Sequence, residues 1–466
     1  MTRAQQYKKR YHFTNDLYVA LVILHLLIGV AIYYIPFFSK LYFIIVCFYF
    51  IGKVLLSDKA SKVMWVLFGC AYIAAAESLF RMTGGGLFYE FSKYYIILLV
   101  LIGMFFTGVS GKSYPYFVYL ILLLPAVLVA STTLGFDLNF RTSVAFVLSG
   151  PVCLGASALY CYHKTITQEQ LLQILACMTF PLLAMMIYLF LYNPSIKEVL
   201  QSTASNFAAS GGFGPNQVAT LLGLGMVTLT VRFFLKSPTL FLKLFNLLLL
   251  ALISFRALVT FSRGGVIAAV MMIIGFLVML YSTSKFKRRQ QIIGSVFILI
   301  IGVVITWSIT ASQTGGLIEN RYTNKDAVGR EKLDLSTGRV ELFIHEFEGF
   351  LRHPFLGVGA SGMKQVRLEE EGKTIASHNE VSRLFSEHGI FGVIILLLLI
   401  ITPLVYRAQH KGNLLFYSFL IFWFATINHS AMRIAAPGFI YGLALLNVIY
   451  EKKRPIHRKQ FKEQNL

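Results

Sequence analysis

Long apolar segments recur along the whole chain, and they limit what it can fold into. Each has about 17–22 residues, enough for an α-helix rising 1.5 Å per residue to cross the hydrocarbon core of a membrane. Of the 466 residues, 56% are hydrophobic and only 14% are charged, far fewer charges than a soluble chain of this size carries. The sequence therefore predicts an all-α polytopic membrane protein.

We expect about fourteen transmembrane helices. They lie near residues 16–36, 41–56, 63–80, 94–110, 116–134, 142–162, 170–192, 215–232, 239–255, 257–280, 291–310, 389–406, 413–429 and 437–450. The basic N-terminus precedes a full-length apolar segment without a small-residue cleavage site, so no cleavable signal peptide is expected. All five cysteines fall inside apolar segments, without disulfide or zinc spacing, which predicts small core side chains.

Basic residues are distributed unevenly between the two sets of loops. An even number of spans puts both termini on one side, and the segments on that side hold 24 of the 42 Lys and Arg. The short loops on the other side hold eight, and one long loop, 311–388, holds ten. Because cytoplasmic loops are enriched in Lys and Arg, both termini are predicted to be cytoplasmic and the long loop extracytoplasmic. Most of the basic residues behind the net charge of +21 would then face anionic lipid head groups on the cytoplasmic side, so the charge does not indicate nucleic-acid binding.

Two arginines interrupt the apolar segments near the predicted outer surface. Arg263 is expected about two helical turns below that surface, and Arg256 precedes it on nearly the same helix face. An arginine in hydrocarbon costs about 2.5–3.5 kcal/mol on insertion scales, so each needs a reason to be there. Either one snorkels to the interface and the other pairs with a carboxylate, or both face a polar cavity that binds an anionic group.

The long loop contains two helix signals, of which the first spans 336–354. Its apolar residues recur at helical spacing, with a serine or threonine available as the cap and a proline at the end. Arg339 then falls in the first turn, where free backbone N–H groups and a guanidinium together suit a phosphate. The alternative is a surface arginine paired with Glu341 or Asp334.

The second helix signal spans 376–392 and contains a histidine. Ser377 and Glu380 match a capping box, and Gly389 is expected to end the helix before the next span. His378 would then lie in the first turn, where the helix dipole lowers the pKa of its imidazole and keeps it able to accept a proton. Alternatively, His378 is only a polar interfacial residue.

Two sequences in the same loop resemble known functional motifs, but their neighbouring residues exclude those functions. The sequence "GVGASG" (357–362) matches a dinucleotide-binding pattern but follows a helix ended by proline instead of a strand, so a tight turn is expected. The sequence "HEFEG" (345–349) has glycine where a zinc protease needs its second histidine. No cluster offers metal ligands at usable spacing, so neither a metal nor a cofactor is expected.

Five motifs in order resemble the O-antigen ligase and polymerase superfamily. They are "GGFGPNQVATLLGLG" (211–225), "TFSRGG" (260–265), "STGR" (336–339), "HPFLGVGASG" (353–362) and "SHNEVSRLFSEHGIFG" (377–392). The resemblance covers residues 205–405 and implies an integral-membrane glycosyltransferase of the GT-C type. Such enzymes transfer a glycan from undecaprenyl diphosphate to a lipid A core, a growing polysaccharide or a protein, on the periplasmic face and without metal or nucleotide sugar.

The resemblance also implies roles for particular residues. His378 would be the catalytic base and Arg339 would hold the diphosphate. Further candidates for binding the diphosphate or the glycan are Arg263, Arg256, Arg433, Asn216 and Asn379. Many ligases carry an arginine just before the glycine-rich turn that leads into Pro-Asn, and this chain has none there. We expect Arg263, Arg256 or Arg433 to supply the missing charge.

These inferences define three regions and one location. Residues 1–204 would be N-terminal transmembrane helices, 205–405 the ligase-like region, and 406–466 the last helices with a basic cytoplasmic tail. The protein would lie in a bacterial inner membrane and serve surface polysaccharide synthesis, such as O-antigen of lipopolysaccharide, capsule or exopolysaccharide.

Two readings from other classes compete with the enzyme. A flippase for lipid-linked oligosaccharides would also have many spans, and Glu77, inside the third one, is its best support, although Glu77 can simply pair with an arginine. A structural scaffold does not explain a capped helix carrying a histidine. We favour the enzyme because the polar residues concentrate at one face.

Overall fold

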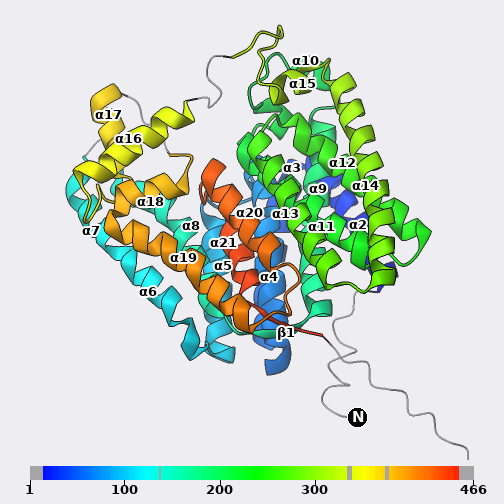
Figure 1. Cartoon of the computed structure of the whole chain (residues 1–466), viewed down its shortest axis with the longest axis horizontal. Helices are drawn as coiled ribbons and strands as arrows, with labels where there is room; N and C mark the ends of the chain where they lie inside the picture. Colours follow the sequence, from blue (N-terminus) through cyan, green and yellow to red (C-terminus); the bar gives the residue numbers. More distant parts are fainter. Residues whose placement is uncertain (1–13, 136–137, 333–337, 373–376, 451–466) are drawn as a thin grey trace, which may run out of the picture.

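The computed structural model describes residues 14–135, 138–332, 338–372 and 377–450, and it is almost entirely helical (Figure 1). The longer helices are α2 Asn15–Tyr34, α3 Pro36–Leu56, α4 Lys59–Met82, α5 Phe91–Thr107, α8 Phe140–Cys161, α9 Gln168–Tyr192, α11 Pro215–Leu235, α12 Leu240–Val259, α13 Arg263–Thr283, α14 Phe286–Gln313, α19 Ile390–Gln409 and α20 Phe416–His429. The other helices are η1 Gly111–Ser113, α6 Tyr114–Leu122, α7 Leu124–Thr133, α10 Ile196–Val199, η2 Ala208–Ser210, α15 Leu317–Tyr322, α16 Arg339–Arg352, α17 Gly362–Glu371, α18 Glu380–His388 and α21 Ala436–Ala444.

Eleven helical segments within the described residues are long and apolar enough to cross a membrane. They confirm the all-α polytopic fold and coincide with eleven of the fourteen predicted spans. The other three are also helices, but shorter ones: α5 has 17 residues, α20 has 14 and α21 has nine. The predicted span 116–134 is divided into α6 and α7 beside Pro125, whose ring nitrogen cannot donate a backbone hydrogen bond.

Burial separates the helices of the centre from those of the rim. In α4, α9 and α11, 83–89% of the most apolar window is buried inside the protein, whereas in α14 only 11% is. Between Ile293 and Ile309, the side chains that α14 leaves exposed are mostly apolar, as expected of a helix that faces lipid. A short parallel pair of strands, β1 Thr165–Thr167 and β2 Asn447–Ile449, ties the start of α9 to the end of the described chain.

The turn between α12 and α13 lies later in the sequence than predicted. Phe261 adopts a left-handed conformation (φ 58°) between the two helices, so Arg263 is the first residue of α13. The predicted position two turns inside a span is therefore wrong, and so is the helix face shared with Arg256, which belongs to α12. Gly265 packs against the backbone of α11, where no side chain would fit, and this contact brings the start of α13 close to α11.

The helices α15 to α18 occupy the segment between α14 and α19, in agreement with the predicted loop 311–388, and lie at one end of the molecule (Figure 1). Gly338 precedes α16, and the predicted caps at 336 and 337 lie outside the described residues. The predicted capping box of α18 is wrong. Asn379 is the cap, and its side chain accepts from the N–H groups of Val381 and Ser382, whereas Ser377 bonds to the backbone of Asn379.

The glycine-rich segment 357–362 forms the expected tight turn. Gly357 and Gly359 both have positive φ, and a side chain at either position would collide with a neighbouring backbone. The turn joins α18 to α7, because Gly359 N donates to Glu387 O (3.1 Å) and Ala360 N donates to Ala126 O (2.8 Å). The segment between α14 and α19, which we call the outer segment after its predicted side of the membrane, is thus bonded directly to the first half of the chain.

Candidate active site

Four arginines from separate segments form what we call the arginine cluster. They are Arg263 at the start of α13, Arg321 in α15, Arg339 at the start of α16 and Arg433 between α20 and α21. Burial lowers the pKa of the Arg321 guanidinium, and the positive charges of Arg263 and Arg339 lower it further. Burial and the charge of Arg263 likewise lower the pKa of Arg339. Arg263, Arg321 and Arg339 are thus close enough for their positive charges to act on one another.

Two cluster members donate hydrogen bonds to uncharged groups. Arg263 Nη1 donates to Asn324 Oδ1 (3.1 Å) and to Arg321 O (3.3 Å), and Arg321 Nε donates to Phe261 O (3.0 Å). Among the described residues, Arg263, Arg321 and Arg339 form no ion pair with a carboxylate. The predicted alternative that pairs Arg339 with Glu341 is therefore not observed, and Asp334 lies outside the described residues. Such a concentration of positive charge favours an anionic ligand.

His378 lies beside this cluster, in the segment that precedes α18. Burial lowers the pKa of its imidazole to about 4, with further contributions from Arg433 and Arg339. The direction agrees with the sequence prediction but the cause does not, because His378 precedes the cap of α18 and is not in its first turn. Within the described residues, His378 Nδ1 is buried without a hydrogen-bond partner. The ring is therefore neutral near pH 7 and has an unused nitrogen.

The segment 377–379 is attached to the α20–α21 region. Arg433 Nη2 donates to Ser377 O (2.8 Å), and Asn379 Nδ2 donates to Asn428 Oδ1 (3.3 Å). Burial lowers the pKa of the Arg433 guanidinium, and the nearby charges of Arg383 and Arg339 contribute in the same direction. Arg433 and Asn379, both predicted site residues, are therefore brought next to His378.

Asn216 connects the start of α11 to the start of α13. Its Oδ1 accepts from Ser262 Oγ (2.6 Å), next to Arg263. One turn further along α11, Thr220 Oγ1 lies 3.3 Å from His429 Nε2, and the ring of His429 packs against Gly264. Sequence reasoning missed His429, whose only signal was its place in a polar segment near the predicted outer surface.

Arg256 does not join the arginine cluster. Its side chain is fully buried in α12, and Nη2 donates to Ala209 O (3.0 Å) just before the glycine-rich turn. The other end of that turn is contacted by Arg81, which the sequence analysis did not single out: its Nη1 donates to Gln217 Oε1 (2.7 Å). Arg256 from α12 and Arg81 from α4 thus both lie near this turn, which has no arginine of its own.

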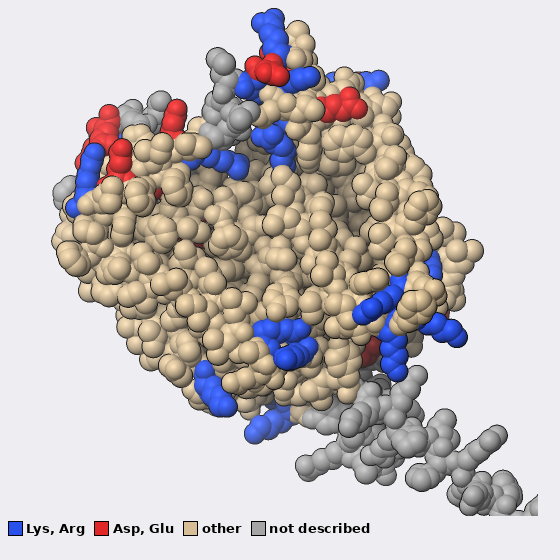
Figure 2. Space-filling view, viewed as in Figure 1, with Lys and Arg blue, Asp and Glu red and all other residues tan. Residues whose placement is uncertain are grey.

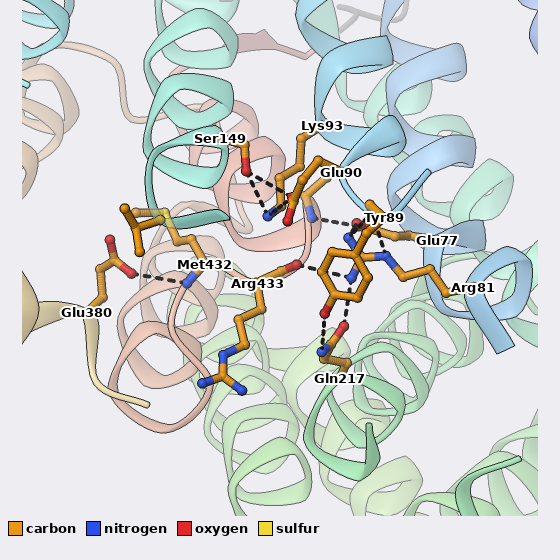
Figure 3. Close-up of polar contacts among 12 residues, drawn as sticks. Glu77, Arg81, Tyr89, Glu90, Lys93, Ser149, Gln217, Glu380, Met432 and Arg433 are labelled. Carbon is orange, nitrogen blue, oxygen red and sulfur yellow. Dashed lines mark hydrogen bonds and ion pairs between the residues drawn. The ribbon is translucent and has the colours of Figure 1, made fainter. Parts of the chain in front are cut away.

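Buried carboxylates hold the site helices in place. Glu380 forms an ion pair with Arg383 and accepts from Met432 N (3.2 Å). Glu346, on α16, is buried and accepts from Ser382 Oγ on α18, so it joins the helix of Arg339 to the helix that follows His378. Glu77, the best support for a transporter, pairs with Arg81 at 2.5 Å (Figure 3).

The fold and this site define a class: a multi-span membrane protein with a cationic site and a neutral histidine between the outer-segment helices and the bundle. The O-antigen ligase family model matches residues 247–397, from α12 into α19. This match confirms the resemblance to the O-antigen ligase and polymerase superfamily, and we call the matched residues 247–397 the ligase domain. The match includes Arg263, Arg339 and His378 but neither Asn216 nor Arg433.

One relative is an uncharacterised protein of Haemophilus influenzae. It is 28% identical to this chain over 211 residues, which are 42% of this chain and 51% of the relative. The chain thus spans about half the length of the relative that it matches. Because the relative is uncharacterised, it supports the existence of related proteins and says nothing of their chemistry.

Proposed function

We propose that the protein is a membrane glycosyltransferase that uses a polyprenyl-diphosphate-linked oligosaccharide, such as an undecaprenyl diphosphate glycan, in surface polysaccharide synthesis. The observation that carries the proposal is the neutral His378 beside an arginine cluster that has no carboxylate partner for Arg263, Arg321 or Arg339 within the described residues. The ligase domain at 247–397 supports the same class of reaction.

In the proposed reaction, an acceptor hydroxyl attacks the anomeric carbon of the donor sugar. The bond from this carbon to the diphosphate oxygen breaks as the new glycosidic bond forms, and the polyprenyl diphosphate leaves. His378 takes the hydroxyl proton, and the arginines stabilise the negative charge of the leaving group where little water screens it. A single displacement of this kind inverts the anomeric centre and requires neither metal nor nucleotide from the protein.

The assay for this function uses purified protein in lipid nanodiscs with a lipid-linked oligosaccharide and a candidate acceptor. We expect a glycan product of inverted anomeric configuration, detected by mass spectrometry and NMR, with release of polyprenyl diphosphate. A deletion strain then separates the branches: surface glycans shortened to single repeats indicate a polymerase, and long chains retained on the lipid carrier indicate a ligase. Protein that transfers none of the strain's own lipid-linked glycans would contradict the proposal.

The proposal requires the site to face the extracytoplasmic side. Figure 2 shows Lys and Arg at both ends of the molecule, whereas most visible acidic side chains lie at the end with the outer-segment helices. The opposite end therefore shows mainly Lys and Arg, as expected if it faces the cytoplasm. Cytoplasmic ends of membrane proteins are enriched in these basic residues.

Cysteine labelling tests the orientation. All five native cysteines are buried, so a single introduced cysteine reports its own position. Val328→Cys, in the outer segment, is expected to react with a membrane-impermeant maleimide in intact spheroplasts, and Gln290→Cys, near the start of α14, only after permeabilisation. The reverse pattern would place the arginine cluster in the cytoplasm and contradict the orientation.

A further inference from the structure

The segment 430–435, which carries Arg433 and which we call the Arg433 loop, is buried although it is not helical. All of its residues except Arg433 are buried, and Ala431 adopts a left-handed conformation (φ 51°). A buried loop cannot bond its backbone to water, so each N–H and C=O group needs a partner in the protein. The partners therefore determine how the loop holds its arginine.

Side chains from α4 and α18 supply partners for three backbone groups of the loop (Figure 3). Glu77 Oε2 accepts from Ala435 N (2.6 Å), Arg81 Nη1 donates to Arg433 O (3.2 Å), and Glu380 Oε2 accepts from Met432 N (3.2 Å). The two residues on α4 thus bond the loop backbone at Arg433 itself and at Ala435. Because a buried backbone group left without a partner destabilises the fold, these bonds constrain the loop.

The guanidinium of Arg81 is held by several groups of the protein. Nε and Nη2 donate to Tyr89 O (3.0 and 2.6 Å), and Nη1 donates to Gln217 Oε1 (2.7 Å) and Arg433 O (3.2 Å). Nη2 also forms an ion pair with Glu77 Oε1 (2.5 Å). Its guanidinium also stacks on the ring of Tyr89, 3.8 Å from the ring centre. Arg81 is therefore fixed by the protein itself.

We propose that the Glu77–Arg81 pair is a positioning unit that holds Arg433, and through it His378, in the geometry needed for transfer. The connection runs from Arg81 to the carbonyl of Arg433, and from the Arg433 guanidinium to the carbonyl of Ser377, next to His378. The proposal rests on the proposed function for its effect on turnover. It assigns a role to α4, which lies outside the ligase domain at 247–397.

The test is Arg81→Lys, which keeps the positive charge but loses the fork that reaches Tyr89, Gln217 and Arg433 together. We expect kcat to fall about tenfold to a hundredfold, as for a small misplacement of a reacting group. Glu77→Gln, which keeps a group able to accept from Ala435 N, is a milder second variant and should act in the same direction. Arg352→Lys is the matched control, because Arg352 is 63% exposed and pairs only with Glu370 in the described chain.

A second measurement, the pKa of His378, distinguishes a displaced Arg433 from a simple loss of folded protein. The charged and titratable groups that lower the pKa of His378 are Arg433, Arg339, His429 and Arg367. If Arg81→Lys loosens Arg433, the pKa of His378 rises, which deuterium exchange at the imidazole C2 carbon measures by mass spectrometry without any substrate. Arg81→Lys added to Arg433→Gln should then raise that pKa no further.

The outcomes distinguish this inference from the proposed function. A wild-type pKa of His378 and wild-type turnover in Arg81→Lys would overturn the positioning role and leave the proposed function standing. A raised pKa in a protein whose wild type transfers no glycan would support the positioning role and contradict the proposed function. Folded protein is verified for every variant by its elution profile and melting temperature.

Discussion

His378→Gln is expected to lower kcat by about 10²–10⁴-fold while donor affinity changes little. Glutamine keeps a hydrogen-bonding side chain but cannot take the acceptor proton, and base catalysis contributes about this much. In the wild type, activity should be lost as the pH falls through the pKa of His378, because the protonated ring cannot accept a proton. This pKa is lowered to about 4 in the ligand-free protein, so the acid limb of kcat/KM is expected there.

The pH profiles of kcat and kcat/KM can be compared with each other, and a second histidine serves as the matched control. Bound diphosphate favours the imidazolium, so the acid limb of kcat should lie at higher pH than that of kcat/KM. His353→Gln, an exposed histidine just after α16, should leave both limbs and turnover unchanged. Near-normal turnover in His378→Gln with an unaltered acid limb would rule out its role as the base and leave a mechanism driven by diphosphate binding.

Arg339→Gln is expected to lower kcat by about 10²–10³-fold, the usual loss when one preorganised donor to a developing negative charge is removed. Arg339 lies at the start of α16, where the free N–H groups of the first turn add to the positive potential. Arg339→Lys keeps the charge but not the bidentate geometry, so only partial recovery is expected. The measurement is transfer of a lipid-linked glycan by variants of equal melting temperature.

The control for Arg339 lies on the same helix. Arg352→Gln removes an exposed arginine from the last turn of α16 and should retain full activity. Arg263→Ala should also lose transfer, but it additionally removes the bond to Asn324, so its melting temperature is expected to fall. Full activity in Arg339→Gln would show that the diphosphate is held elsewhere in the cluster.

The apolar segments could be predicted because the length and the polarity of a segment can be read directly from its residues. The turn before Arg263 could not be placed from the sequence. Its position goes with the close contact of Gly265 with α11, and a contact between two helices leaves no local sequence signal. Likewise, Ser377 and Asn379 compete locally for the role of helix cap. Sequence spacing favoured the serine, whereas the structure uses the asparagine, whose side chain accepts from two N–H groups.

The candidate site could be predicted only in part. Arg339 and His378 lie in one loop, and family resemblance indicated both. Arg81 could not be predicted as a partner of Arg433, because 352 residues separate them in the chain. The available signal was Glu77, four residues before Arg81 and so on the same helix face, which indicated the ion pair but not the loop that it supports.

The bonds between the outer segment and the first half of the chain limit how specificity can be transplanted between relatives. Thr133 Oγ1 donates to Val358 O (3.0 Å) and Arg383 Nη2 donates to Val147 O (2.9 Å), in addition to the bond from Ala360 to Ala126. A chimera that exchanged the ligase domain alone would pair the donors of one protein with the backbone carbonyls of another. We therefore expect a chimera to fold only when α7 and α8 are exchanged together with the outer segment. The part of the chain that has to be exchanged as one unit is thus larger than the ligase domain.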